Sequence, residues 1–154
     1  MYYREIISPL GNILLQCNDH AITGLWLDRE LPGGVNSEES LLLRAQAWLD
    51  AYFRGENPGL DLPLEPEGTA FQKQVWQILL TIPYGSSMTY GEIAARLGRR
   101  MSAQAVGGAV GRNPIALMIP CHRVLGAKGA LTGFGYGLER KKQLLDLEKI
   151  PYRE

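Results

Sequence analysis

A proline-rich acidic segment divides this chain into two unlike parts. Residues 57–68 contain three prolines and three acidic residues, a composition that favours neither a helix nor a central strand. Before this segment the pattern is typical of strands, and after it apolar residues recur at helical spacing. The predicted fold class is therefore α+β. A small N-terminal domain of antiparallel sheet and helix is expected at residues 1–60, a linker at 61–68, and a mainly helical C-terminal domain at 69–154.

The N-terminal part is predicted to form a three-stranded sheet and one helix. Strands are expected at residues 2–7, 12–17 and 21–27, separated by turn-forming residues. A helix is expected at residues 38–54, with Ser37 as its cap and Gly55 as its stop. One face of that helix is apolar: Leu41, Leu42, Ala45, Trp48, Leu49 and Tyr52.

The C-terminal part is predicted to contain four helices, at residues 69–82, 89–97, 103–111 and 138–150. Thr69 with Gln72, and Thr89 with Glu92, have the spacing of capping boxes at the first two helix starts. The second and third helices, joined by a short turn, match the helix-turn-helix pattern, although many helical hairpins match it as well.

Glycine is unusually frequent in two segments of the C-terminal part. Gly107 and Gly108 lie inside the third predicted helix, where each glycine costs about 1 kcal/mol of helix stability. Either a tightly packed neighbouring helix or a nucleic acid close to the backbone would explain them. Residues 126–137 hold five more glycines and predict a wing-like loop. Arg140-Lys141-Lys142, which follows this loop, is expected to form a solvated face unless DNA passes beside it.

The net charge of zero hides an asymmetry between the two parts. Residues 1–70 carry 4 basic and 11 acidic side chains, a charge of −7, whereas residues 71–154 carry 12 and 5, a charge of +7. A basic half is the footprint expected of phosphate contacts, although two solvated surfaces of unlike sign would look the same. No run approaches the roughly 18 apolar residues of a membrane span, so no membrane is expected as a partner.

Cys121 followed by His122 is the strongest candidate for chemistry. A thiol needs a lowered pKa to be a good nucleophile near neutral pH, and an adjacent proton acceptor is the usual means, so a lowered pKa is expected for Cys121. A lone Cys-His pair is also compatible with a buried structural cysteine. The only other cysteine is Cys17, and with no export signal the pair indicates a reducing compartment, the cytoplasm. Cys17 and His20 could in principle bind a zinc ion together with Cys121 and His122. Adjacent ligands give poor chelate geometry, so no metal is expected.

The surroundings of this cysteine carry a resemblance to a known family. Asn113-Pro114, the pentapeptide Pro120-Cys121-His122-Arg123-Val124, a glycine-rich segment and Leu144-Leu145-Asp146-Leu147-Glu148 resemble the active-site region of the O6-alkylguanine-DNA alkyltransferases. The resemblance extends from about Thr69 to Glu148, and residues 1–68 carry no comparable motif. It implies one irreversible transfer of an alkyl group from O6-alkylguanine in DNA to a cysteine, without a cofactor. It leaves O4-alkylthymine open as a second substrate.

The resemblance assigns a chemical role to each of five residues. Cys121 matches the nucleophile that accepts the alkyl group, and His122 matches the residue that takes the thiol proton through a bridging water. Glu148 matches the carboxylate that orients this histidine. Asn113 matches the asparagine that ties the turn before the cysteine to the helix-turn-helix. Tyr90 matches the tyrosine beside the flipped base, where it can donate a proton or stack.

The implied partner is double-stranded DNA, bound through its minor groove with the target base extruded. Arg99 and Gln72 match positions that contact the DNA backbone. Two residues depart from the pattern of the family. Gln104 replaces an arginine that fills the gap left by the flipped base, and Phe134 replaces a tyrosine of the substrate pocket, where the nearby Tyr136 could substitute. These departures bear on efficiency more than on reaction class.

Two other functions remain open from the sequence. An alkyltransferase-like protein would bind alkylated bases and recruit other repair proteins without accepting the alkyl group, but such proteins lack the acceptor cysteine that is present here as Cys121. An unrelated thiol hydrolase or peroxidase would require an oxyanion or resolving-cysteine pattern, which the sequence does not contain. The free protein is expected to be a monomer.

Overall fold

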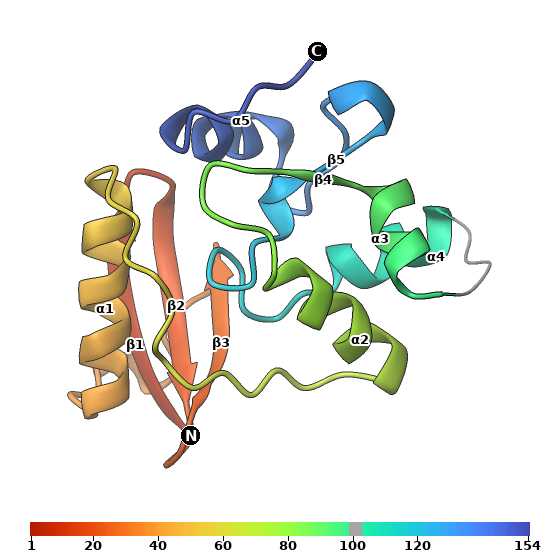
Figure 1. The fold of residues 1–154 in the computed structure, drawn as a ribbon. Coiled ribbons are helices and arrows are strands. Elements are labelled where there is room, and N and C mark those ends of the chain that lie inside the picture. The colour runs from red at the N-terminus through yellow and green to blue at the C-terminus, as the bar shows by residue number, and fades with distance from the viewer. Residues whose placement is uncertain (99–102) are drawn as a thin grey trace. The chain divides into compact units, whose positions relative to one another are not determined.

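The computed structural model describes residues 1–98 and 103–154 (Figure 1). The chain forms two compact units. The first unit contains residues 1–67 and 114–116, and the second contains residues 68–113 and 117–154. Strands and helices are combined, so the predicted α+β class is confirmed. Within the described ranges, no helix has both the length and the apolar character needed to span a membrane.

The first unit is a three-stranded antiparallel sheet with one long helix against it. The strands are β1 (Tyr2–Ser8), β2 (Gly11–Cys17) and β3 (Ile22–Leu27), paired in the order β1-β2-β3. The short 3₁₀ helix η1 (Pro32–Gly34) leads to α1 (Ser40–Phe53), which packs against all three strands. The core between them is apolar and includes Ile13, Leu15, Leu25, Leu42 and Leu49, all of them fully buried.

The prediction that Ser37 caps α1 is wrong. The helix begins at Ser40, and Glu39 is its N-cap without a side-chain hydrogen bond. The backbone N–H of Ser37 donates instead to the carbonyl of Tyr3 in β1, over 2.8 Å. Because this segment pairs with the outer edge of the sheet, its backbone is extended and cannot enter the helix earlier.

The outer edge of β3 is covered by two segments from elsewhere in the chain. Backbone groups of Ile22 make hydrogen bonds of 2.9 and 2.8 Å with residues 63–65, which lie in the segment predicted as a linker. Those of Leu25 make hydrogen bonds of 2.9 and 3.1 Å with residues 114–116. Both segments run parallel to β3. The edge therefore has few unpaired groups, and the backbone five residues before Cys121 is fixed by the sheet.

The second unit is mainly helical. Its helices are α2 (Ala70–Leu79), α3 (Tyr90–Arg96), α4 (Ala103–Gly111) and α5 (Leu138–Leu147). Its short elements are β4 (Met88–Thr89), η2 (Cys121–Arg123), β5 (Val124–Leu125) and η3 (Ala127–Gly129), with β4 and β5 paired in parallel. Both predicted capping boxes are confirmed, because each threonine side chain accepts from the N3 backbone and each N3 side chain accepts in return. The helices α2 and α5 each end three residues earlier than predicted.

Trp76 joins α2 to α4. Its ring is buried, and its indole N–H donates to the carbonyl of Ala109 over 2.9 Å. On α4 the buried side chains are Val106, Ala109 and Val110, all small or medium-sized. Gly108 is not part of this face, and a Cβ atom on it would meet nothing within 4 Å, so tight helix packing does not account for that glycine.

Candidate active site

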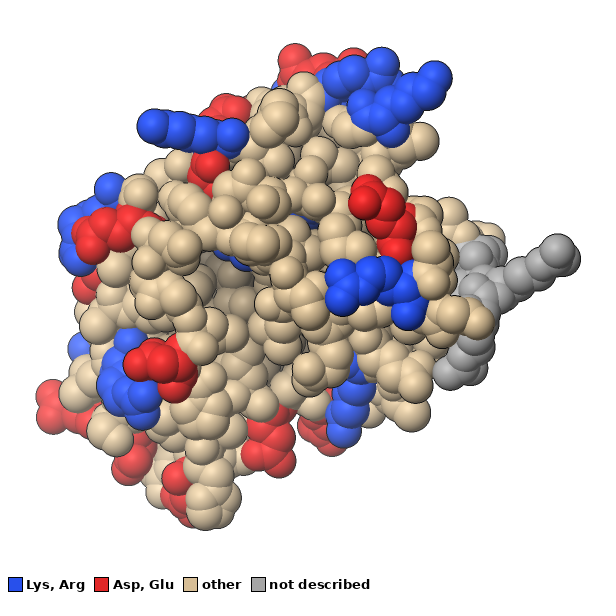
Figure 2. All heavy atoms as spheres, in the orientation of Figure 1, with Lys and Arg blue, Asp and Glu red and all other residues tan. Residues whose placement is uncertain are grey.

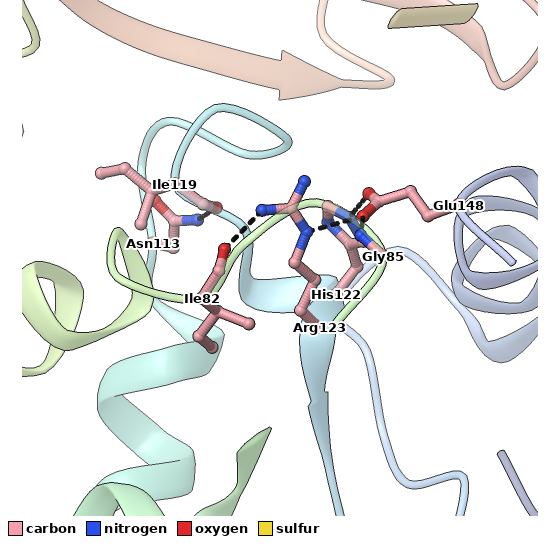
Figure 3. Close-up of polar contacts among 7 residues, drawn as sticks. All are labelled: Ile82, Gly85, Asn113, Ile119, His122, Arg123 and Glu148. Carbon is pink, nitrogen blue, oxygen red and sulfur yellow. Dashed lines mark hydrogen bonds and ion pairs between the residues drawn. The ribbon is translucent and has the colours of Figure 1, made fainter. Parts of the chain in front are cut away.

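Cys121 begins η2 and lies at the wall of a pocket in the second unit. The side chain is 8% exposed, and the segment before it is buried from residue 115 onward. The side-chain amide of Asn113 donates to the carbonyl of Ile119 over 2.7 Å, which closes the loop that leads from α4 to the cysteine (Figure 3). This hydrogen bond ties the turn before Cys121 to the residues that follow α4.

The pocket beside Cys121 has a volume of about 430 Å³. Its lining is rich in glycine and aromatic residues: Tyr90, Gly107, Val110, Gly111, Asn113, Cys121, Gly133, Phe134, Gly135 and Tyr136. The rings of Phe134 and Tyr136 meet edge to face, with centroids 5.8 Å apart. A Cβ atom on Gly107 would lie 3.8 Å from the ring of Tyr90, so the glycine leaves α4 flat where it faces the pocket. The structure thus brings together five predicted residues: Cys121, Asn113, Tyr90, Phe134 and Tyr136.

A buried polar network extends from His122 (Figure 3). Nε2 of His122 lies 2.6 Å from Oε2 of Glu148, and both side chains are fully buried. The other carboxylate oxygen of Glu148 accepts from Nε of Arg123 over 2.7 Å and from the backbone N–H of Gly85 over 3.1 Å. The guanidinium of Arg123 also donates to the carbonyl of Ile82 over 2.7 Å. Glu148, at the end of α5, is thus bonded both to the turn at residues 82–85 and to η2.

This geometry determines which nitrogen of His122 can act as a base. An ionised carboxylate only accepts hydrogen bonds, so Nε2 of His122 carries the proton that faces Glu148. In the neutral ring the lone pair then lies on Nδ1. His122 therefore offers Nδ1 as its proton acceptor, and Glu148 stabilises the charged ring that protonation creates.

Burial sets the resting protonation of the cysteine and the histidine. It raises the pKa of the Cys121 thiol, against the opposing effects of a hydrogen bond from Asn113 and the positive charge of Lys141. Burial also lowers the pKa of His122, although Glu148 favours the charged ring. The sequence-based expectation of a lowered thiol pKa is therefore wrong. The resting pair is a neutral thiol and a neutral imidazole, and the thiolate forms only when the proton is transferred.

Lys141 corrects another prediction, because it does not belong to a solvated face. Its side chain is 0% exposed, and Nζ donates to the carbonyls of Val124, Thr132 and Gly133 over 2.6, 3.0 and 3.4 Å. Burial lowers its pKa to about 8. The ammonium group thereby fixes the start of the pocket wall at residues 132–133 against β5.

Two predicted residues lie apart from this pocket. Gln104 is exposed on the first turn of α4 and does not line the pocket. The side chain of Gln72 accepts from the N–H of Thr69 in its capping box, and the residue is partly exposed at the start of α2. Arg99 falls outside the described residues.

Arg123 and Lys141 are site residues that the sequence reasoning missed. Arg123 was within the recognised pentapeptide, but its role depends on Ile82, Gly85 and Glu148, which are distant in sequence. Lys141 lies in a basic run, and only its place in the helix offered a signal. It stands three and four residues before the buried Leu144 and Leu145, and therefore on the inward face of α5.

The charge asymmetry of the sequence is carried by the two units. The first unit holds 4 basic and 11 acidic residues, and the second holds 12 and 5. Figure 2 shows one face, on which basic side chains gather over the part of the second unit that carries η3.

Across residues 1–98 and 103–154, no group of three or more His, Cys, Asp or Glu side chains is arranged to hold a metal ion.

Comparison with known families gives matches over both units. The DNA-binding domain of 6-O-methylguanine DNA methyltransferase matches residues 70–150, and the ribonuclease-like domain of the same methyltransferase matches residues 1–66. The methylated-DNA–protein-cysteine methyltransferase of Haemophilus influenzae is 44% identical, over 99% of this chain and 88% of its own length. That of Methanosarcina acetivorans is 45% identical, over 96% and 98%.

Solved structures agree with these sequence relatives. The crystal structure of Mycobacterium tuberculosis OGT in complex with DNA matches with a TM-score of 0.87 and 45% identity, covering 97% of this chain and 93% of that one. An O6-methylguanine DNA methyltransferase from Methanococcus jannaschii matches with a TM-score of 0.70 and 33% identity, covering 97% and 95%.

Proposed function

The chain belongs to the 6-O-methylguanine DNA methyltransferase family, and from this premise we propose that it repairs DNA by direct alkyl transfer. The substrate is O6-alkylguanine in double-stranded DNA, and the acceptor is Cys121. The observation that carries this proposal is that Cys121 lines the pocket and is followed directly by His122, which Glu148 holds. His122 provides a base for a thiol that burial keeps neutral.

The reaction is a displacement at the alkyl carbon. The thiol proton of Cys121 passes through one bridging water to Nδ1 of His122, and the resulting imidazolium is stabilised by Glu148. The sulfur forms a bond to the alkyl carbon while the carbon–O6 bond breaks. Tyr90 donates a proton to the leaving guanine and regains one from the solvent. The products are a thioether on Cys121 and unmodified guanine.

The same chemistry limits each molecule to one reaction. The carbon–sulfur bond of the thioether is stable to water, and no second thiol is among the residues that line the pocket. Asn113 holds the turn that carries Cys121 in place, and Phe134 and Tyr136 provide the aromatic wall for the base. The pocket volume of about 430 Å³ suits a small ligand such as one nucleobase.

Residues 69–154 are proposed to carry both DNA binding and the alkyl acceptor. Their charge of +7 over residues 71–154 supports phosphate contacts, and the flat glycine surface of α4 supports close approach to the minor groove. Gln104, exposed on α4, is proposed to fill the space of the extruded nucleotide. Arg99 and Gln72 are proposed to contact the DNA backbone. Because the thiol must stay reduced, we assign the protein to the cytoplasm.

Intact-protein mass spectrometry tests the proposal. Incubation with an excess of duplex oligonucleotide containing O6-methylguanine should add the mass of one methyl group per chain, located on Cys121. Cys121→Ala should abolish the addition, whereas the matched change Cys17→Ser, in a buried cysteine of β2, should leave it intact. Repeated turnover by one molecule would contradict the proposal. Binding of the oligonucleotide without a gain of mass would instead assign the protein to the alkyltransferase-like class.

A further inference from the structure

Arg123 is the only residue of the Cys121–Leu125 segment with a buried charge that the proposed reaction does not use. It follows His122 directly, its side chain is 10% exposed, and its guanidinium lies on the carboxylate that holds the histidine. A buried cation so close to the proton acceptor affects both the geometry and the charge of that acceptor. The question is what it contributes there.

The geometry gives Arg123 control over the orientation of Glu148. The two carboxylate oxygens have separate tasks, because Oε2 faces His122 while Oε1 accepts from Arg123 and from the N–H of Gly85. A carboxylate with donors on only one oxygen can rotate, whereas this one is held on both (Figure 3). Arg123 supplies the charge-assisted bond on the oxygen away from the histidine, and such bonds are about twice as strong as neutral ones.

Arg123 also fixes the turn that supplies the other donor. Its Nη1 donates to the carbonyl of Ile82 over 2.7 Å, and its guanidinium lies 5.8 Å from the ring centroid of Tyr84. The turn continues into β4, which pairs with β5 immediately after Arg123. One side chain therefore joins the turn at 82–85, the end of α5 and η2.

We propose that Arg123 is a positioning residue for the proton acceptor: it holds Glu148 in the orientation that aligns His122, and its positive charge keeps the imidazole in its neutral, proton-accepting form. This inference rests on the proposed function, because it assigns a role within the same site. The charged groups that act on His122 are Glu148, Arg123 and Lys141, and its neighbour Cys121 is the other titratable group beside it. Glu148 favours the charged ring, and the two cations oppose it.

The inference predicts different effects for two substitutions of Arg123. Arg123→Met removes the positive charge beside Glu148 while His122 still faces that carboxylate. Protonation of His122 then becomes easier, so the acidic limb of the rate profile should move to higher pH by about one unit, which is about tenfold in rate below the limb. Arg123→Lys keeps the charge but cannot reproduce both hydrogen bonds in the same geometry. Its limb should stay in place while the rate falls several-fold at every pH.

The assay is the alkylation of Cys121 by iodoacetamide between pH 5 and 9, followed by intact-protein mass in a Cys17→Ser background. It needs no DNA, so it can fail while methyl transfer from the oligonucleotide succeeds, and the reverse also holds. Arg44→Met, in an exposed arginine of α1, is the matched control and should leave the profile unchanged.

NMR titration of the His122 ring in the wild type and in Arg123→Lys gives a second measurement that does not depend on the folding of Arg123→Met. A displaced limb in Arg123→Met, with the same ring pKa in the wild type and Arg123→Lys, supports the role. A uniform fall in rate without displacement, or a changed ring pKa in Arg123→Lys, overturns it.

Discussion

Replacing Lys141 by methionine should change how the stability of the protein depends on pH. The buried ammonium group has a pKa lowered from 10.5 to about 8, because burial disfavours its charged form. The unfolded chain therefore binds more protons than the folded one between pH 8 and 10.5. Stability must rise with pH across that window and must be lost again as the pH falls through 8. The direction is opposite to that of a lysine held by a buried carboxylate.

The magnitude follows from the same difference in pKa. A fall from 10.5 to about 8, at about 1.4 kcal/mol per pKa unit, corresponds to roughly 3 kcal/mol of unfolding free energy between the two ends of the window. The thiols of Cys17 and Cys121 act in the opposite direction, because burial raises the pKa of each and stability from them is lost as the pH rises. The informative quantity is thus the difference between the wild type and Lys141→Met, in which the thiol contributions largely cancel.

Urea unfolding followed by circular dichroism, from pH 7 to 10.5, measures this difference. Lys141→Met should be destabilised at all pH values, because the carbonyls of Val124, Thr132 and Gly133 lose their donor. The difference in unfolding free energy between the wild type and the variant should nevertheless change by about 3 kcal/mol between pH 8 and 10.5, because the wild type becomes more stable as the pH rises. A gap that stays constant would refute the reasoning, because it would mean that Lys141 titrates alike in the folded and unfolded chains.

Three further predictions concern the substrate, the proton acceptor and the C-terminus. Gln104→Ala should slow repair of duplex DNA yet leave the reaction with free O6-benzylguanine nearly unchanged, because no base flipping is then needed; an equal loss on both substrates would contradict its proposed place. Replacing His122 and Glu148 together should cost less in repair rate than the two single effects added, and strict additivity would mean that they act independently. Arg153→Pro removes the N–H that donates to the carbonyl of Gly129 over 2.8 Å and should lower the unfolding free energy measured in urea by about 1 kcal/mol, whereas Arg153→Ala should not.

The features that could be predicted from the sequence are those that depend on near neighbours. The capping boxes that begin α2 and α3 were predictable because each involves residues three apart, and the strands of the first unit because short apolar runs are separated by turn-forming residues. The location of Cys121 in a pocket followed from a motif of contiguous residues. The start of α1 was not predictable in this way, since Ser37 is held by the backbone of Tyr3, 34 positions earlier.

The buried charges were beyond prediction for the same physical reason. A lysine beside an arginine and a second lysine is usually solvated, and nothing local in the sequence of residues 140–142 distinguishes the central one except its helical phase. Its burial is tolerated because three carbonyls from residues 124–133 converge on Nζ. Arg123 likewise depends on a carbonyl at Ile82 and a carboxylate at Glu148, which the fold brings together.

The neutral resting state of the site suits a protein that each reaction consumes. A thiol with a lowered pKa would be a thiolate throughout the life of the molecule and would react with any small electrophile or oxidant that reached it. Burial raises the pKa of Cys121 instead, and the base that can deprotonate it, His122, is held by Glu148 through Nε2, the nitrogen opposite the proton-accepting Nδ1. Reactivity then requires an electrophile positioned in the pocket, so that proton transfer and carbon–sulfur bond formation occur together. The cations Arg123 and Lys141 fit this arrangement, because they favour the neutral imidazole at rest while their buried positions keep the pocket wall and Glu148 fixed.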